Sequence, residues 1–529
     1  MQRQSDWTGI LVIALVGVVL FGAVDYSGDY AINDDWGYAT PVRWWVEDGR
    51  LALTHWQSMP LLTQLAMGIG WAEIFGYSPE SLRRLTLTLA LVASLSVYGL
   101  ARRLDLSPGP ALLAALLPLA SPIFLGLSYT FMTDVPFAAV LLISTLCFAQ
   151  SFRSGGVTSF ALGVVFLLLA ILLRQTALAL AVALVLAEPM ARGFSLLRVL
   201  RSIAVLVVSV SLYWITADAI ADSIGLPYYY ELKTDAVLRF ALAALRQEYE
   251  TLLVAPQAIL RASALFGLTL LPVLPFLWPK RGQMGFLGVG TAIILIAGLT
   301  WASARLETGV FFAAPGDMLT AEGLGPRHLE GRLPDGGLWA IAASGLGHAV
   351  TILALFTALR RQKSPPPART GIQALLFLTG AILYAPHVVA DTWNFDRYAL
   401  LPAILLSLVV LSRTDTDRPA AGGLSTGLVA VGLALSLVLV HDFFRWQDAR
   451  YDLIASLDRP ASEIDGGFEF NNRAVLLTDP PEAHALQLVS TRGRPIRIVH
   501  RPRLADTVLD QREVPQLLGL RTAHIYAVE

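Results

Sequence analysis

The chain has 529 residues, of which 55% are apolar and only 15% are charged, and its mean hydropathy is +0.60. A soluble domain averages about 45–50% apolar and about 25% charged residues, so this composition excludes an ordinary cytosolic enzyme, a disordered protein and a disulfide scaffold. The 39 basic and 40 acidic residues nearly cancel, which gives no sign of a nucleic-acid partner, and the single cysteine, Cys147, has no disulfide partner.

Apolar windows along the chain predict membrane-spanning helices. A span needs about 20 mainly apolar residues, because the hydrocarbon core is about 30 Å thick and a helix rises about 1.5 Å per residue. Thirteen such windows occur, at residues 8–24, 85–104, 109–127, 132–151, 157–172, 174–188, 202–220, 257–278, 284–300, 338–359, 371–388, 397–413 and 424–441. The first is not expected to be a removable signal, because no small-residue cleavage site precedes Asp25. We therefore expect a mainly α-helical polytopic membrane protein with about thirteen transmembrane helices.

Basic residues collect in the short loops on one side of these windows, where acidic residues are few. The positive-inside rule places that side in the cytoplasm. An odd number of spans then leaves the N-terminus inside and the segment 442–529 outside. The other outside segments are 25–84, 221–256 and 301–337, so large outer loops face compact inner turns. We expect the work of the protein at the outer, periplasmic face of a bacterial inner membrane, and amphipathic helices in the first outer loop.

The composition changes after residue 441. Apolar runs become short there and are separated by Pro, Gly and Asp, as expected of a small domain that contains strands. These runs are Ala474–Thr478, Ile496–Val499 and His524–Val528. We therefore divide the chain into a transmembrane catalytic domain, 1–441, and a small periplasmic α/β domain, 442–529.

The first outer loop contains an acidic pair, Asp34 and Asp35. Adjacent carboxylates repel, which raises the pKa of at least one of them unless a cation lies close, and a raised pKa suits a general base. The alternative is a hydrated loop in which one of the two acids caps a helix through Val42–Val46. On the residues alone the capped loop is slightly favoured, since an acidic pair by itself is weak support for a site.

Two further charged residues fall where charge in a membrane is costly. Asp134 stands where an outer turn enters the fourth span, and ionisable groups at such depth are rare and usually functional. The alternative is that Thr133 or Asp134 only caps the helix, with Pro136 in its first turn. Arg174 lies between two apolar runs at the outer face, where a guanidinium can bind phosphate through paired donors. The alternative is an arginine that snorkels to the interface. In both cases we favour the functional interpretation.

A fourth group of polar residues lies at an outer end, at 391–398. On residue type alone, Asp396 and Arg397 are interpreted as a simple ion pair, and Tyr398 as part of an interfacial aromatic belt. In the first loop, His55 is better explained as an exposed or capped histidine than as a ligand.

These four places share the outer face, and together they suit one reaction. In this reaction an acceptor hydroxyl or amine attacks a sugar whose leaving group is a lipid phosphate. A carboxylate takes the proton from the nucleophile and balances the oxocarbenium character of the transition state, and an arginine stabilises the charge that grows on the leaving phosphate. A lipid-linked donor also explains why the catalyst would lie in the bilayer.

Short motifs occur in a fixed order along the chain: Asp34-Asp35-Trp36-Gly37-Tyr38, Pro60-Leu61, Arg84-Leu85, Asp134-Val135-Pro136, Arg174, Arg397-Tyr398 and Pro402. In these motifs the chain resembles the GT-C superfamily of integral-membrane glycosyltransferases, in the branch of the protein O-mannosyltransferases and the lipid A aminoarabinose transferases. The likeness covers residues 1 to about 413, and the tail only by position. One departure is that relatives often carry a lysine before the Pro-Leu pair, where this chain has Ser58-Met59.

The resemblance implies an inverting glycosyltransferase that uses a polyprenyl-phosphate sugar donor. It implies that Asp34 is the catalytic base and that Asp35 and Asp134 support it. The implied ligands of the donor phosphate are Arg174, Arg397 and, in place of the missing lysine, Arg84 or Arg83. The residues expected in the substrate pocket are Tyr38, His55, Tyr129, Gln175 and Tyr398. Whether Asp34 and Asp134 hold a divalent metal ion stays open, because metal dependence differs across the superfamily.

The sequence does not name the sugar, and the acceptor can be a glycolipid such as lipid A, a polysaccharide or a protein. Two other classes remain as alternatives, a lipid or solute transporter and a non-catalytic scaffold whose tail binds a periplasmic partner. A transporter needs ionisable residues at mid-depth in the bilayer. Most charges here lie at span ends and no internal repeat is visible, which argues against transport.

Overall fold

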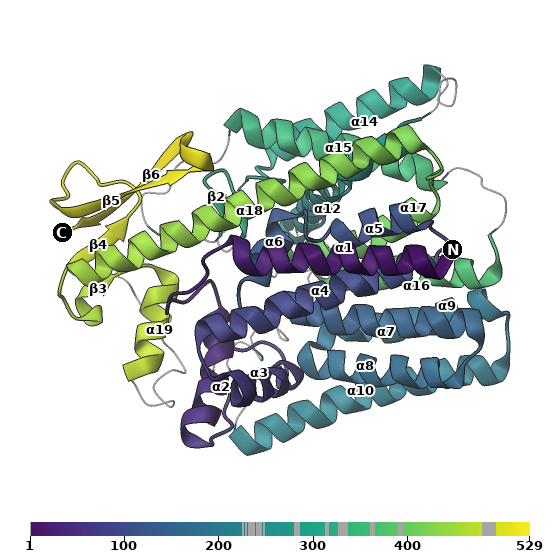
Figure 1. Ribbon diagram of the computed structural model, residues 1–529, viewed down its shortest axis with the longest axis horizontal. Coiled ribbons are helices and arrows are strands. Elements are labelled where there is room, and N and C mark those ends of the chain that lie inside the picture. Colours follow the sequence, from purple (N-terminus) through teal and green to yellow (C-terminus); the bar gives the residue numbers. More distant parts are fainter. Residues whose placement is uncertain are drawn as a thin grey trace.

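The computed structural model describes residues 2–54, 56–224, 227, 230, 239, 246, 249–279, 286–312, 317–325, 329, 337–359, 365–389, 395–478 and 494–529. Most of its long helices run alongside one another in a single bundle (Figure 1). In the described ranges, ten helices are long and apolar enough to cross a membrane. The prediction of a mainly α-helical, multi-pass membrane protein is therefore confirmed.

The helices of the bundle are α1 (Gln2–Ala23), α4 (Pro79–Arg103), α5 (Pro108–Leu116), α6 (Pro122–Ser128), α7 (Asp134–Ser154), α8 (Val157–Leu173), η1 (Gln175–Ala177), α9 (Leu178–Arg192), α10 (Leu196–Ile224), α12 (Tyr249–Leu270), η2 (Leu271–Val273), α13 (Leu274–Leu277), α14 (Phe286–Arg305), α15 (Gly337–Leu359), α16 (Pro367–Val389), η3 (Asp396–Ala399), α17 (Leu400–Ser412) and α18 (Pro419–Ser456). Each of the thirteen predicted windows overlaps one of them. The number of full-length spans is smaller, because the window 109–127 is divided between α5 and α6, and α8 and α17 have only 17 and 13 residues. The division follows from proline, since Pro118 and Pro122 have no backbone N–H to continue a helix.

The first outer loop forms two helices, α2 (Asp35–Asp48) and α3 (Leu62–Phe75), as predicted. Both lie at the same end of the bundle as the C-terminal sheet, and the N-terminus lies at the opposite end (Figure 1). We call the end with α2, α3 and the sheet the loop end. At the other end Arg102 binds Asp6 near the N-terminus, with 2.7 Å between Nε and Oδ1. The N-terminus therefore shares its end with at least one of the basic loops.

A small sheet follows α18. Its strands are β3 (Ile464–Asp465), β4 (Ile496–Val499), β5 (Val508–Gln516) and β6 (Arg521–Val528), in the order β3-β4-β6-β5, with η4 (Ala461–Glu463) before β3. Strand β3 is parallel to β4, and the other pairs are antiparallel. The strands expected near Ile496–Val499 and His524–Val528 are confirmed, and the domain boundary proposed at 441/442 falls inside α18.

The run Ala474–Thr478 is not a strand, as the sequence suggested, but the last part of helix α19 (Phe468–Thr478). The helix starts six residues earlier, where Asp465 Oδ1 accepts hydrogen bonds from the Gly467 backbone N–H (3.1 Å) and the Asn471 amide (2.7 Å). Because the preceding turn already fixes a helix, the short apolar run continues it instead of starting a strand.

Candidate active site

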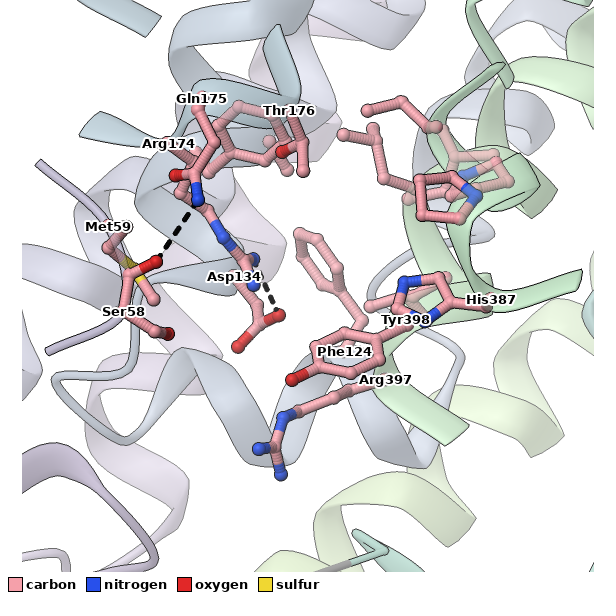
Figure 2. Close-up of a pocket in the computed structure, with 18 of the residues that line it drawn as sticks. Ser58, Met59, Phe124, Asp134, Arg174, Gln175, Thr176, His387, Arg397 and Tyr398 are labelled. Atoms are coloured by element: carbon pink, nitrogen blue, oxygen red, sulfur yellow. Dashed lines mark hydrogen bonds and ion pairs between the residues drawn. The ribbon is translucent and has the colours of Figure 1, made fainter. Parts of the chain in front are cut away.

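A cavity of about 350 Å³ lies at the loop end, where α7, η1, α16 and α17 come together. Figure 2 shows polar side chains gathered around the open space, with Phe124 among the apolar residues of its wall. The residues predicted from the sequence that line this cavity are Asp134, Arg174, Gln175, Arg397 and Tyr398. The fold therefore brings three distant parts of the chain to one space.

The first charged pair of the cavity joins Asp134 to Arg174. The N-terminal residue Thr133 makes no side-chain cap at the start of α7, and the Asp134 carboxylate turns to Arg174 instead, with 3.0 Å between Oδ1 and Nη1 (Figure 2). Both side chains are largely buried, 8% and 16% exposed. The second oxygen, Oδ2, is buried and has no hydrogen-bond partner among the residues that the structure describes. Asp134 therefore keeps one acceptor that its arginine does not use.

Arg174 reaches this position because the backbone changes course there. It has extended φ and ψ (−144° and 128°) between the end of α8 and the short helix η1. Burial opposes the charge of its guanidinium, but the nearby Asp134 carboxylate outweighs burial and raises the pKa of Arg174. A permanently charged donor is thus held in a largely buried site.

The second pair joins residues from the two ends of the transmembrane region. Asp34 is the residue before α2 and makes no side-chain cap there. Its Oδ2 lies 3.3 Å from Nη2 of Arg397, which is 4% exposed. Asp396 has a different set of contacts, since its carboxylate accepts from the backbone N–H groups of Met318 (3.0 Å) and Leu319 (2.8 Å). The two residues interpreted as a simple pair therefore serve separate contacts.

The two acids of the first loop diverge because of a left-handed turn. Asn33 has a φ of 54°, and Asp35 Oδ1 accepts the backbone N–H of Ile32 at 2.8 Å. Asp35 is buried, and burial raises its pKa to about 6, with the charge of Arg83 opposing the rise. The expected rise within the pair thus falls on Asp35, and its largest cause is burial.

Tyr398 lies between the two arginines of the cavity. Its ring centroid is 5.9 Å from the guanidinium carbon of Arg174 and 5.4 Å from that of Arg397. His387 of α16 stacks on the same ring, with 4.6 Å between centroids and 18° between planes. Tyr38 is buried nearby, and burial together with the Asp34 charge raises its pKa well above the usual value. These rings fix the spacing of the charged groups.

The sequence did not identify three residues that shape this site. His387 lies in an apolar helix without a motif, and Arg261 and Asp317 have no informative spacing. Arg261 Nη1 lies 3.0 Å from both carboxylate oxygens of Asp317, and Asp317 Oδ1 accepts the backbone N–H of Asp396 at 3.0 Å. This buried network, together with the hairpin β1 (Leu319–Thr320) and β2 (Gly323–Leu324), holds η3 and hence Arg397 in place.

Other predicted residues lie away from the cavity or in a supporting position. Arg84 is exposed and binds Glu80, and Tyr129 is buried with its hydroxyl donating to the Leu20 carbonyl. His55 lies outside the described residues. Arg83, the other candidate for the missing lysine, is 1% exposed and donates to backbone carbonyls.

The position of the missing lysine can be located in the structure. Ser58 and Met59, which precede the Pro-Leu pair, line the cavity, and Gln175 Nε2 donates to the Ser58 carbonyl at 3.1 Å (Figure 2). This loop segment therefore reaches the cavity but brings no cation there.

The acids of the site do not fit a divalent metal ion. Within the described ranges there is no group of three His, Cys, Asp or Glu side chains that could hold one. Asp34 and Asp134 each face a guanidinium, which already balances the carboxylate charge. No chemical step is therefore derived through a metal.

Comparison with known proteins finds one matching family, described as dolichyl-phosphate-mannose-protein mannosyltransferase, over residues 59–216. This segment includes Asp134 and Arg174 but neither Asp34 nor Arg397. No curated protein sequence matches the chain. The family match confirms the resemblance to GT-C glycosyltransferases over that segment.

Two solved structures illustrate the similarity of fold. The crystal structure of ArnT from Cupriavidus metallidurans bound to undecaprenyl phosphate is 14% identical, with 98% of this chain and 97% of that chain covered and a TM-score of 0.41. The apo oligosaccharyltransferase of Archaeoglobus fulgidus is 13% identical, with 82% of this chain and 56% of that chain covered and a TM-score of 0.42.

Proposed function

We propose that the chain is a membrane glycosyltransferase of the GT-C type, which transfers a sugar from a polyprenyl-phosphate donor to an acceptor hydroxyl or amine with inversion at the anomeric carbon. The observation that carries the proposal is that two acid–arginine pairs, Asp134–Arg174 and Asp34–Arg397, lie beside one cavity. The family match over residues 59–216 supports the same class of reaction.

The proposed reaction forms one bond and breaks one. The acceptor oxygen or nitrogen attacks the anomeric carbon from the face opposite the donor phosphate, and the bond from that carbon to the phosphate oxygen breaks. The proton of the acceptor goes to a carboxylate, and the lipid phosphate leaves with the electron pair of the broken bond. Asp34 is the proposed base, with Arg397 holding its carboxylate in position at 3.3 Å. Asp134 supports it, because its unpaired Oδ2 can accept a hydrogen bond from a substrate hydroxyl.

The leaving phosphate requires positive charge close to the point where negative charge grows. Arg174 and Arg397 supply it from opposite sides of the Tyr398 ring. Phe137 and Leu401 belong to the apolar wall of the cavity, which suits the first part of a polyprenyl chain attached to that phosphate. We place the reaction at the periplasmic leaflet of a bacterial inner membrane, with the N-terminus in the cytoplasm and the C-terminal sheet in the periplasm.

The test uses the purified full-length chain in lipid nanodiscs with radiolabelled polyprenyl-phosphate sugars and candidate glycolipid, polysaccharide and protein acceptors. We expect label to move from the donor to one acceptor class with release of polyprenyl phosphate. Asp34→Asn should abolish transfer while the protein remains folded, and Arg153→Ala, a change at the far end of α7, should retain it. Full activity of Asp34→Asn would refute the assignment of the base, and movement of intact donor across the membrane without its consumption would indicate a transporter.

A further inference from the structure

The C-terminal sheet carries two fully extended leucine side chains on one turn. The turn is η6 (Leu517–Gly519) with the next residue, Leu520, and it joins β5 to β6. Leu518 is 87% exposed and Leu520 is 88% exposed. Burial of one leucine contributes about 1.5–3 kcal/mol, so a soluble domain that leaves two on a turn forgoes a sizeable stabilisation.

The backbone of the same turn is unusual for leucine. Leu517 and Leu518 have φ values of 49° and 59°, and Gly519 follows with 89°. Side chains with a Cβ rarely adopt this left-handed region, and turns that need it normally carry Gly, Asn or Asp. The chain thus keeps leucines where turn geometry favours other residues, which indicates that the apolar side chains serve a contact.

The turn is attached to a membrane-spanning helix. The Leu517 backbone N–H donates to Asp442 Oδ2 of α18 at 2.6 Å. Leu517 and Asp442 also line a cavity of about 230 Å³ together with Leu435 and Leu439 of α18. The turn therefore lies against the outer part of α18 and not at the free edge of the sheet.

The surface of α18 changes character at this level. Val431 and Leu435 are 64% and 49% exposed, as expected of side chains that face lipid. Beyond them come the charged residues Asp442 and Arg445, the latter exposed. Leu435 and Asp442 are seven residues apart, about 10 Å along a helix. The turn is therefore attached where the apolar surface of the bundle gives way to a polar one.

We propose that Leu518 and Leu520 insert into the lipid surface of the membrane at the loop end of the bundle. The exposed apolar side chains of the turn continue the lipid-facing surface of α18, and membrane lipid is the occupant that this continuity favours. Arg445 of α18 and Arg521, the residue after Leu520, are positioned at the height of lipid headgroup phosphates.

The membrane contact also bears on the position of the β1–β2 hairpin. Arg521 Nη1 donates to the carbonyl of Ala321 in this hairpin at 3.2 Å. The backbone N–H groups that bind Asp396 belong to the first strand of the same hairpin and its preceding residue. A turn anchored in lipid thus holds the hairpin that packs against η3. This consequence does not depend on which reaction the cavity performs.

The test places a fluorescent probe on the turn. Cys147 is replaced by alanine, and single cysteines are introduced as Leu518→Cys, Leu520→Cys and, as matched control, Leu504→Cys. Leu504 is also fully exposed, but it lies in the turn between β4 and β5, at the opposite end of the β5–β6 hairpin. Each full-length variant is labelled with an environment-sensitive dye and placed, one copy per particle, in nanodiscs with and without lipids that carry a quencher just below the headgroup.

We expect a blue-shifted emission and strong quenching by the lipid-attached quencher for the probes at positions 518 and 520, and neither effect at position 504. The replaced side chains are exposed, so the substitutions leave the fold intact, and two independent positions guard against the failure of one. Quenching at 518 and 520 no stronger than at 504 would overturn the proposal. A blue shift at both positions without lipid quenching would also overturn it, because the turn would then bind protein and not lipid.

Discussion

Two regions of the loop end use buried arginines in opposite ways. In the first loop, Arg83 donates to the backbone carbonyls of Tyr26 (2.7 Å), Gly28 (3.0 Å) and Tyr30 (2.7 Å). In the cavity, Arg174 instead faces a carboxylate that keeps a second oxygen unpaired in the part of the chain described. The first arrangement satisfies acceptors that would otherwise be buried without partners, and so it stabilises the loop. The second leaves charge and an acceptor beside an open space, which is what binding and catalysis require.

Removal of the arginine in the first region should have the largest effect on stability. Arg83→Ala leaves three carbonyls without their donor and opens a void next to the Tyr30 ring, 4.9 Å from the guanidinium carbon. Loss of a buried charged group with several hydrogen bonds costs about 3–5 kcal/mol. Thermal unfolding of the full chain in detergent measures the loss. An unfolding temperature equal to that of the parent would contradict the assignment of Arg83 as a clamp.

A pH profile separates the two acids of the first loop. The pKa of Asp35 is raised to about 6 by burial, whereas an unfolded aspartate has about 3.9. The folded chain therefore binds this proton more tightly, so the contribution to stability is present below about pH 4 and is lost as the pH rises through 6. Asp35→Asn removes the titration but keeps an oxygen that can accept the Ile32 N–H. We expect the variant to gain on the order of 2–3 kcal/mol relative to the parent by pH 7.

The measurement is the unfolding midpoint of parent and variant between pH 4.5 and about 7.5, a range that spans the Asp35 titration. Asp48→Asn, an exposed change at the other end of α2, serves as control and should leave the profile unchanged. A parallel decline of stability in parent and Asp35→Asn would show that Asp35 does not titrate as burial requires. Transfer activity of Asp35→Asn then decides whether this residue also supports catalysis, as the motif comparison implies.

The sequence predicts local structure at this end well, because the signals are local. Apolar windows identify the helices of the bundle, and the acidic pair correctly precedes a helix. The same signals favoured Asp34 as a cap, since nothing nearby in the sequence competes for its carboxylate. The competitor is Arg397, 363 residues away, and such a contact depends on how the whole bundle packs.

The remaining parts of the site carry no local signal at all. Asp317 and Arg261 are ordinary charged residues until the fold places them 3.0 Å apart beneath η3. His387 becomes a cavity residue only because α16 ends next to Tyr398. In contrast, Arg84 matches a family motif but lies on an exposed helix face, so the motif defines the sequence neighbourhood and the fold decides which side chain points inward.

The cavity arginines should affect ligand binding more than stability. Arg174→Ala removes charge-assisted hydrogen bonds to a phosphate, worth about 1.5–3 kcal/mol, so binding of undecaprenyl phosphate should weaken about tenfold to a hundredfold. Arg174→Lys should lie between the variant and the parent, because an ammonium keeps the charge but not the planar pair of donors. Lipid titration by native mass spectrometry or tryptophan fluorescence measures the affinity.

A matched control lies on the other end of α7. Arg153 binds Asp105 there, far from the cavity, and Arg153→Ala should bind the lipid phosphate as the parent does. Equal weakening by Arg153→Ala and Arg174→Ala would mean that the lipid is attracted by overall charge. Unchanged affinity of Arg174→Ala would remove this arginine from the phosphate site.

The smallest effect should come from Arg84, and it tests the comparison of regions most directly. Its side chain is 53% exposed and binds Glu80 one turn earlier on α4, an arrangement that usually contributes less than about 0.5 kcal/mol. The motif comparison implies a phosphate ligand at this place, whereas the structure puts the cavity elsewhere. If contacts seen in the fold govern binding, Arg84→Ala retains the affinity for undecaprenyl phosphate and the thermal stability of the parent. A tenfold loss of affinity with unchanged stability would mean that Arg84 turns inward when the lipid arrives, and the division into clamp and cavity would then have to include the outer face of α4.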